Sequence, residues 1–111
     1  MPESSVMQAI ADPQYLFTAV NNFLLVAGKQ PLFDVELVGS KKEVKLNNGM
    51  YVVSTNRQLK DIKKTDLVII PALFGDMATA IEMNKALLPW IEEQYDNGAE
   101  VASLCVGAFL L

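Results

Sequence analysis

The chain has 111 residues, of which 51% are apolar and 20% are charged, a composition that suits one compact domain with a buried core. Thirteen acidic and nine basic residues give a net charge of −4, which disfavours a nucleic-acid surface because phosphate binding needs a sustained positive field. A single cysteine and no histidine exclude an intramolecular disulfide and disfavour a zinc site. Because no signal peptide or membrane-spanning run is evident, we expect a cytoplasmic protein. We also expect neither a metal site nor a cofactor.

The N-terminal half predicts a helix, a strand and a hairpin in that order. Asp12 and Pro13 have the residue types of an N-cap and a first helical position, and Gly28 is placed to end the helix. Alternating apolar and acidic residues over 33–37 predict a half-buried strand. Residues 44–46 and 50–53 flank Asn-Asn-Gly, which predicts a tight hairpin.

The C-terminal half predicts a strand, a helix and a second strand. The apolar run 67–70 is typical of a strand buried on both faces of a parallel sheet, and we expect it to be central. Residues 72–82 should be a loop that runs into a helix. The next helical face comprises Leu87, Trp90, Ile91, Gln94 and Tyr95, which requires Pro89 to lie in the first turn of its helix. Residues 99–104 predict another strand, parallel and adjacent to 67–70, within a three-layer α/β arrangement.

Cys105 lies where the last predicted strand turns into a following helix. Ser103 and Gly107, two positions to either side, are small enough to allow the sharp turn that exposes a nucleophile at the carboxyl edge of a sheet. A helix beginning there would direct backbone N–H groups and its positive end towards the sulfur, which favours a reactive thiol. The alternative is a structural cysteine buried in the core. The pattern alone supports both interpretations.

The run from Val101 to Leu111 resembles the nucleophile elbow of the ThiJ/PfpI group, within the class I glutamine amidotransferase-like superfamily. More narrowly, it is similar to the N-terminal domain of AraC-type transcription regulators. Residues 66–71 resemble the strand that leads to the family's oxyanion loop, and residues 10–13 with Phe17 resemble the start of its first helix. The resemblance implies an incomplete three-layer sandwich over residues 1–111, with a mainly parallel, flavodoxin-like sheet. It also implies that the first strand, the second half of the domain and a helix-turn-helix module lie outside this chain.

The resemblance places a ligand pocket around Cys105, Val106, Phe74 and Gly75. Family enzymes have an acid near the nucleophile, but the aligned position here is Ala9; Glu3 is the candidate substitute, or simply a solvated carboxylate. The family's Pro-Gly-Gly loop is replaced by Pro-Ala-Leu at 71–73. Because the chain also lacks a histidine base, we expect Cys105 not to sustain hydrolysis.

Three functions therefore stay open. The leading hypothesis is a regulatory domain that binds an unknown small-molecule effector and controls DNA binding through a module outside this chain. The first alternative is a hydrolase, amidase or hydratase with Cys105 as nucleophile. The second is a dimerisation module with a structural cysteine. In each case missing partner elements would leave apolar surface and strand edges exposed, so we expect a homo-oligomer.

Overall fold

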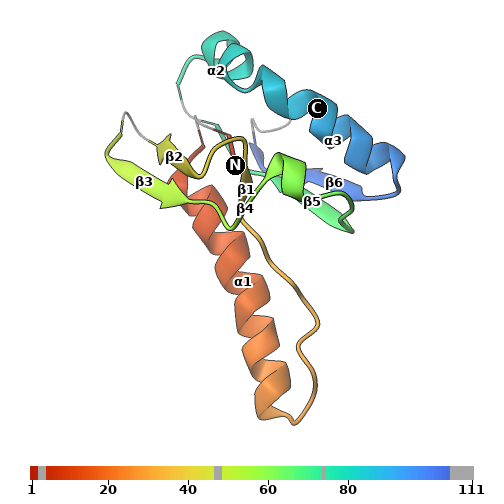
Figure 1. Cartoon of the computed structure of the whole chain (residues 1–111). Coiled ribbons are helices and arrows are strands. Elements are labelled where there is room, and N and C mark those ends of the chain that lie inside the picture. Colours follow the sequence, from red (N-terminus) through yellow and green to blue (C-terminus); the bar gives the residue numbers. More distant parts are fainter. Residues whose placement is uncertain (3–4, 47–48, 74, 106–111) are drawn as a thin grey trace.

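The computed structural model describes residues 1–2, 5–46, 49–73 and 75–105, which form a mixed α/β structure (Figure 1). This part of the chain contains three α-helices and three two-stranded sheets, two of them parallel. The helices are α1 (Met7–Val26), α2 (Met77–Met83) and α3 (Leu88–Asp96), with 3₁₀ turns at Leu59–Asp61 and Lys85–Leu87. The strands are β1 (Val38–Gly39), β2 (Glu43–Leu46), β3 (Tyr51–Ser54), β4 (Arg57–Gln58), β5 (Leu67–Ile70) and β6 (Glu100–Ser103).

Helix α1 begins at Met7, so the prediction that it starts at Pro13 is wrong. Val6 is the N-cap and makes no capping hydrogen bond through its side chain. Its backbone N–H instead donates to the carbonyl of Ala72 at 2.8 Å, which fixes the entry to the helix. Pro13 lies inside the helix, where it lacks an N–H and its ring crowds the Ala9 carbonyl. The hydrogen bond that anchors Val6 thus extends the helix through Pro13, although proline usually lies at the first position of a helix.

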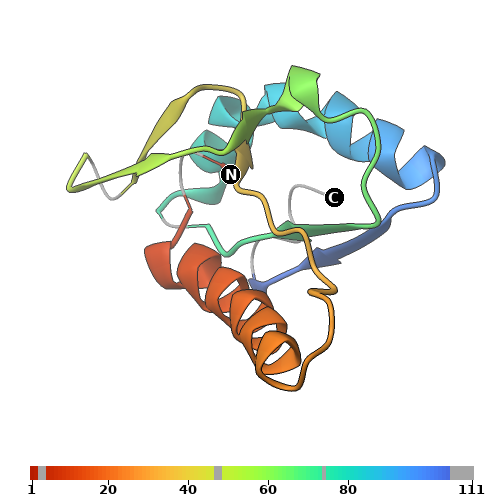
Figure 2. The same ribbon diagram turned by 60° about the horizontal axis from the view of Figure 1, so that its bottom comes forward.

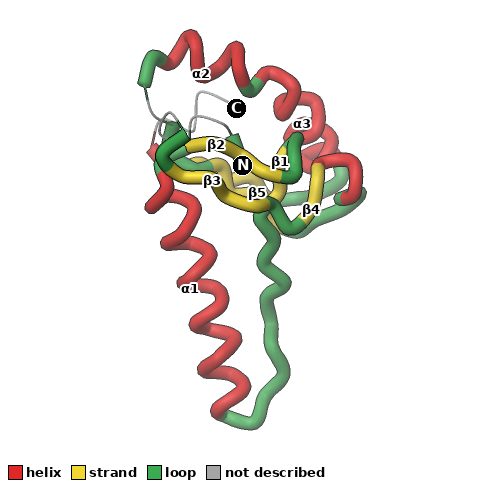
Figure 3. The backbone as a smooth tube through the Cα atoms, turned by 60° about the vertical axis from the view of Figure 1, so that its left-hand side comes forward, coloured by secondary structure: helices red, strands yellow, loops and turns green. Residues whose placement is uncertain are grey.

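Residues 33–37 form no strand, so the second N-terminal prediction is also wrong. The backbone N–H groups of Leu32 and Phe33 donate to Asn21 Oδ1 at 3.0 and 2.9 Å, and Asn21 Nδ2 donates to the Phe33 carbonyl at 2.6 Å. The Phe33 ring meets Phe17 edge-on, with ring centroids 4.8 Å apart. The segment therefore runs back along α1 (Figures 1 and 3). Its first strand pairing comes only at β1, whose Val38 lies opposite Arg57 of β4 in a parallel register.

The predicted hairpin is confirmed. Strands β2 and β3 pair antiparallel, from Glu43 opposite Ser54 to Leu46 opposite Tyr51. One side of β2 is fully buried, with Val44 and Leu46 at 1% and 0% exposure. The Asn-Asn pair at 47–48 lies outside the described residues.

Strands β5 and β6 are parallel and adjacent, as predicted, in a register from Leu67 opposite Glu100 to Ile70 opposite Ser103. Helices α2 and α3 connect them, and Pro89 lies in the first turn of α3 as expected. Gly98, at a φ of 97°, adopts the left-handed conformation that ends α3. Helices α2 and α3 lie on one side of this sheet and α1 on the other (Figure 2). In the described part of the chain β5 pairs with β6 alone, so its expected central position is not observed.

Most of the buried apolar residues that the structure describes belong to two small clusters. Ile70, Leu73 and Ala80 form the first, on the side of the sheet that α2 and α3 cover. Ile10, Val44 and Leu46 form the second, between α1 and the hairpin. Large apolar side chains stay exposed elsewhere, including Leu67 at 42% and Leu104 at 36%. The expected exposure of apolar surface is therefore present in the described residues.

Candidate functional site

The carboxyl ends of β5 and β6 meet at one edge of their sheet. The backbone N–H of Leu104 donates to the Ile70 carbonyl at 2.9 Å, which extends the pairing past the last residue of β6. Leu73, just after β5, forms an isolated antiparallel bridge with Ser5. The N-terminus of α1 is thereby held against the same edge. In open α/β sheets the carboxyl edge is the usual place for a ligand.

Cys105 directly follows this edge and has a backbone φ of 50°. It is the one non-glycine residue with a positive φ among the residues that the structure describes. The left-handed conformation is unfavourable for a residue with a Cβ, and such strain collects at functional turns. The cysteine is exposed, so it belongs to neither apolar cluster. The sequence prediction of a sharp turn at this residue agrees with its backbone conformation.

Gly75 precedes α2 on the segment that follows β5. The next residue, Asp76, is the N-cap of α2 and accepts hydrogen bonds from the Thr79 hydroxyl at 2.8 Å and the Thr79 N–H at 3.0 Å. These hydrogen bonds lower the pKa of the Asp76 carboxyl, and the bond from the Thr79 hydroxyl contributes more than the bond from the backbone N–H. Asp76 therefore has a structural task in starting α2.

Three of the predicted site residues, Glu3, Phe74 and Val106, lie outside the described residues. Cys105 and Gly75 are described, and each follows one strand of the β5–β6 pair. Ala9, aligned with the family's acid, lies in the first turn of α1 and is partly buried. Ala72, where the family has glycine, accepts the hydrogen bond that anchors Val6.

An open apolar hollow of about 600 Å³ lies between α1 and the β5–β6 sheet. The sheet contributes Ile69, Ala102 and Leu104, and the residue after Leu104 is Cys105. Helix α1 contributes its own apolar side chains together with Asp12 and Gln8. A hollow of this size accommodates a small organic molecule. Sequence analysis did not find it, because the register between a helix and a sheet cannot be read from either pattern alone.

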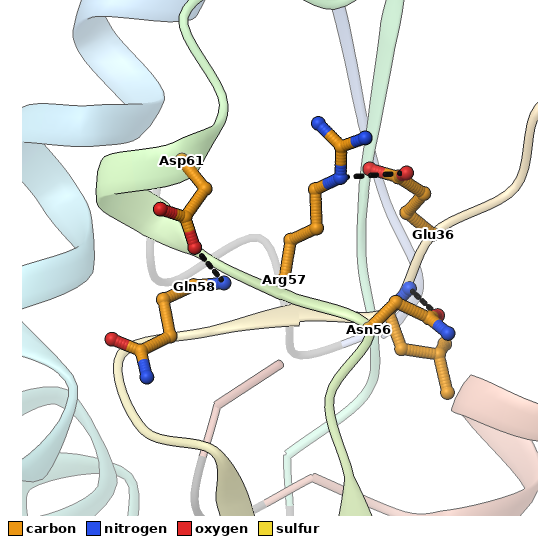
Figure 4. Close-up of polar contacts among 6 residues, drawn as sticks. Glu36, Asn56, Arg57, Gln58 and Asp61 are labelled. Carbon is orange, nitrogen blue, oxygen red and sulfur yellow. Dashed lines mark hydrogen bonds and ion pairs between the residues drawn. The ribbon is translucent and has the colours of Figure 1, made fainter.

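A second cavity, of about 540 Å³, is lined by part of α1, β5, Trp90 of α3 and the segment 32–38. Of the polar residues labelled in Figure 4, Glu36, Arg57 and Asp61 line this cavity. Glu36 and Arg57 form an ion pair at 3.0 Å, and Asn56 Oδ1 accepts the Leu37 N–H at 2.7 Å. Sequence analysis missed this group because its residues come from two separate segments, and no pattern in the sequence indicates that these segments lie side by side.

Two kinds of feature are absent from the described residues. They contain no group of three histidine, cysteine or acidic side chains placed to hold a metal ion. None of the helices described has the length and apolar character needed to cross a membrane.

Comparison of the chain with models of protein families, with curated proteins and with solved structures finds no match.

Proposed function

We propose that the chain is the ligand-sensing part of a cytoplasmic domain of the ThiJ/PfpI type, which controls DNA binding by a separate module of an AraC-type transcription regulator. The observation that carries the proposal is the conformation of Cys105, an exposed residue with a φ of 50° directly after a parallel strand. That combination is typical of a nucleophile elbow, in which the turn presents a side chain at the carboxyl edge of the sheet.

The proposed fold is a three-layer sandwich with a mainly parallel, flavodoxin-like sheet. The parallel register of β5 and β6 supports it, because parallel sheets are covered by helices on both faces. The placement of α1 opposite α2 and α3 also supports it (Figure 2). Strands outside this chain would extend the sheet on either edge of the β5–β6 pair.

The proposed effector is a small molecule that binds at this edge, near Cys105 and Gly75. The hollow beside Leu104 supports a largely apolar effector, because its lining contains one charged residue, Asp12. Turnover is disfavoured by the chemistry of the chain. Hydrolysis needs a proton acceptor near the sulfur, and the chain has no histidine and has Ala9 at the position aligned with the family's acid.

Thiol alkylation tests whether the elbow conformation activates Cys105. The rate with iodoacetamide is measured on the folded chain and on the same chain in urea, so that the unfolded thiol serves as the reference. We expect the folded chain to react faster at neutral pH, and an effector bound nearby to slow the reaction. A folded rate equal to or below the unfolded rate would favour a structural cysteine.

Two further assays separate the sensor from the alternatives. A panel of amide and aldehyde substrates, with Cys105→Ser as control, should show no turnover that depends on Cys105; such turnover would make the protein an enzyme.

In a gel-shift assay at physiological salt, the chain alone should leave duplex DNA unshifted, because its net charge is −4. A protein in which the chain is joined to its DNA-binding module should shift its operator. Retardation by the chain alone would contradict the assignment of DNA contact to another module.

A further inference from the structure

The sheet formed by β5 and β6 has one open edge along β5. At the start of the pair the Glu100 N–H donates to the Asp66 carbonyl at 2.9 Å. At its end the Leu104 N–H donates to the Ile70 carbonyl, also at 2.9 Å. In the parallel register of the pair, these two bonds mean that Val68 and Ile70 direct their backbone groups towards β6.

Leu67 and Ile69 therefore direct their backbone N–H and C=O groups away from β6. The Leu67 carbonyl accepts a hydrogen bond from the Thr65 hydroxyl at 3.4 Å. The Leu67 N–H and both backbone groups of Ile69 have no partner among the described residues, where β5 pairs with β6 alone. Ile69 is partly buried. Because backbone groups shielded from water need hydrogen-bond partners, this edge is suited to pairing with a further strand.

The cavity of about 540 Å³ follows this open edge. Every residue from Asp66 to Pro71 lines it. Side chains of a strand alternate between its two faces, so a cavity that meets consecutive residues lies beside the edge of the strand and not over one face. Residues 32–38 line the same cavity from outside the sheet. The space beside β5 is therefore in the position that a neighbouring strand would occupy.

Apolar side chains border this cavity on both sides of the sheet. Ile10 and Phe17 come from α1, and Leu87, Trp90 and Ile91 come from the side that α2 and α3 cover (Figure 2). A strand next to β5 would lie between these two layers, so both rows of its side chains would be apolar. Four acidic and three basic side chains also line the cavity, so its charge is nearly balanced and favours an uncharged guest.

From the open edge and the cavity beside it, we propose that the chain takes up an extended apolar segment of another polypeptide, which pairs with β5 as a further strand. Such a segment carries N–H and C=O groups at the spacing of those of Leu67 and Ile69, which a small organic molecule does not match along a whole strand. At about 3.3 Å per residue, a guest of about four to five residues matches β5. The proposal rests neither on Cys105 nor on the effector of the proposed sensor.

Amide hydrogen exchange tests this pairing residue by residue. The probe is a capped synthetic peptide with five valine and isoleucine residues between two lysines at one end and two glutamates at the other, added to the whole chain. The amides of Val68 and Ile70, which donate to β6, should exchange slowly with and without the peptide. Those of Leu67 and Ile69 should exchange quickly in the free chain and at least 10-fold more slowly with the peptide.

Two results of the exchange measurement would overturn the proposal. The first is unchanged exchange of the Leu67 and Ile69 amides when the peptide is added. The second is protection of both amides in the free chain at high concentration that is lost on dilution, which would mean that a second copy of the chain fills the cavity.

N-methylation of the peptide separates strand pairing from apolar binding. Two control peptides carry N-methyl groups at the odd or at the even apolar positions, so each keeps its side chains and loses the donors along one edge. Trp90 lines the cavity, so its fluorescence reports binding. The peptide methylated on the edge that meets β5 should bind at least 10-fold more weakly than the parent peptide. Parent affinity for both controls would assign the cavity to small apolar molecules and overturn the proposal.

A substitution at the start of β5 tests the same edge from the side of the protein. Leu67→Pro removes one N–H of the open edge, at the first residue of a strand, where proline is tolerated. The matched control, Leu67→Ala, shortens the same side chain and keeps the N–H. Leu67→Pro should weaken binding of the peptide several-fold more than Leu67→Ala, and equal affinities of the two variants would refute pairing at this edge. If Leu67→Pro does not fold, the exchange and N-methyl measurements decide.

Discussion

Gln94 is the most deeply buried polar side chain of α3, at 1% exposure. Its Nε2 donates to the Lys63 carbonyl at 3.4 Å, but its Oε1 has no hydrogen-bond partner among the described residues. A buried acceptor without a partner costs about 1–3 kcal/mol. We therefore expect Gln94→Met, which keeps the size of the side chain, to raise the free energy of unfolding by about 1 kcal/mol in urea titrations. Gln94→Glu should lower it, because it buries a charge; destabilisation by both changes would mean that the bond to Lys63 dominates.

The amino group of Met1 gives the chain an unusual pH dependence. The group donates to the Val38 carbonyl in a partly buried position, and desolvation lowers its pKa from 8.0 to about 5. Between pH 5 and pH 8 the unfolded chain therefore binds more protons than the folded chain, so the free energy of unfolding rises with pH across this window.

We expect that rise to be on the order of 2–4 kcal/mol, measured by urea titration at several pH values. A chain with an acetylated N-terminus has no amino group to titrate and should lose this part of the pH dependence. A profile that acetylation leaves unchanged would show that the amino group is solvated in the folded state.

The sequence predicted single residues well where local geometry alone decided their conformation. Gly98 ends a helix and Cys105 occupies a strained turn, since both follow from the residue type and its immediate neighbours. The surroundings of Cys105 could not be predicted in the same way. The hollow beside it depends on side chains of α1 that are about 90 residues away in the chain, such as Asp12 and Leu16.

Among the elements, α1 contains the clearest local conflict. Pro13 interrupts its hydrogen bonds one and a half turns after Met7. Proline inside a helix is unfavourable by about 3 kcal/mol relative to alanine, and part of this is offset because proline also restricts the unfolded chain. We expect Pro13→Ala to raise the free energy of unfolding by about 1–2 kcal/mol.

The matched control for this change is Gln14→Ala, an exposed neighbour with nearly the same helix propensity as alanine. It should change stability by less than about 0.5 kcal/mol in the same titration. The Pro13 ring lines both cavities. If Pro13→Ala lowered the free energy of unfolding, the packing of this ring would contribute more to stability than the repaired hydrogen bond.

The sequence pattern was reliable where alternation or an apolar run decided the pairing of strands, and it failed where a side chain occupied the backbone groups of a predicted strand. The hairpin at 43–54 and the parallel pair β5–β6 follow from alternation, apolar runs and turn residues. The strand expected over 33–37 has the right alternation, but Asn21 takes the backbone groups that a neighbouring strand would need. Periodicity shows which side chains can be buried together, without showing what buries them.

For the whole molecule, the division of the core into two clusters has an energetic consequence. Val44 belongs to one cluster and Ile70 to the other, and the two residues share no packing partner in either cluster. Val44→Ala and Ile70→Val should each lower the free energy of unfolding, by about 1–2 and about 1 kcal/mol respectively. In the double variant the losses should add to within about 0.5 kcal/mol. A larger coupling would mean that the clusters act as one core.

Trp90 is the only tryptophan of the chain, and its indole N–H donates to the Ile62 carbonyl at 3.3 Å. It also lines the cavity between β5 and the segment 32–38. At wavelengths above the tyrosine band, the fluorescence of the protein therefore comes from Trp90 alone. A molecule that enters this cavity displaces water near the indole and moves the emission to shorter wavelength. An effector that protects Cys105 from alkylation and leaves the emission unchanged binds in the hollow beside Leu104 instead, so two unlabelled signals distinguish the two cavities.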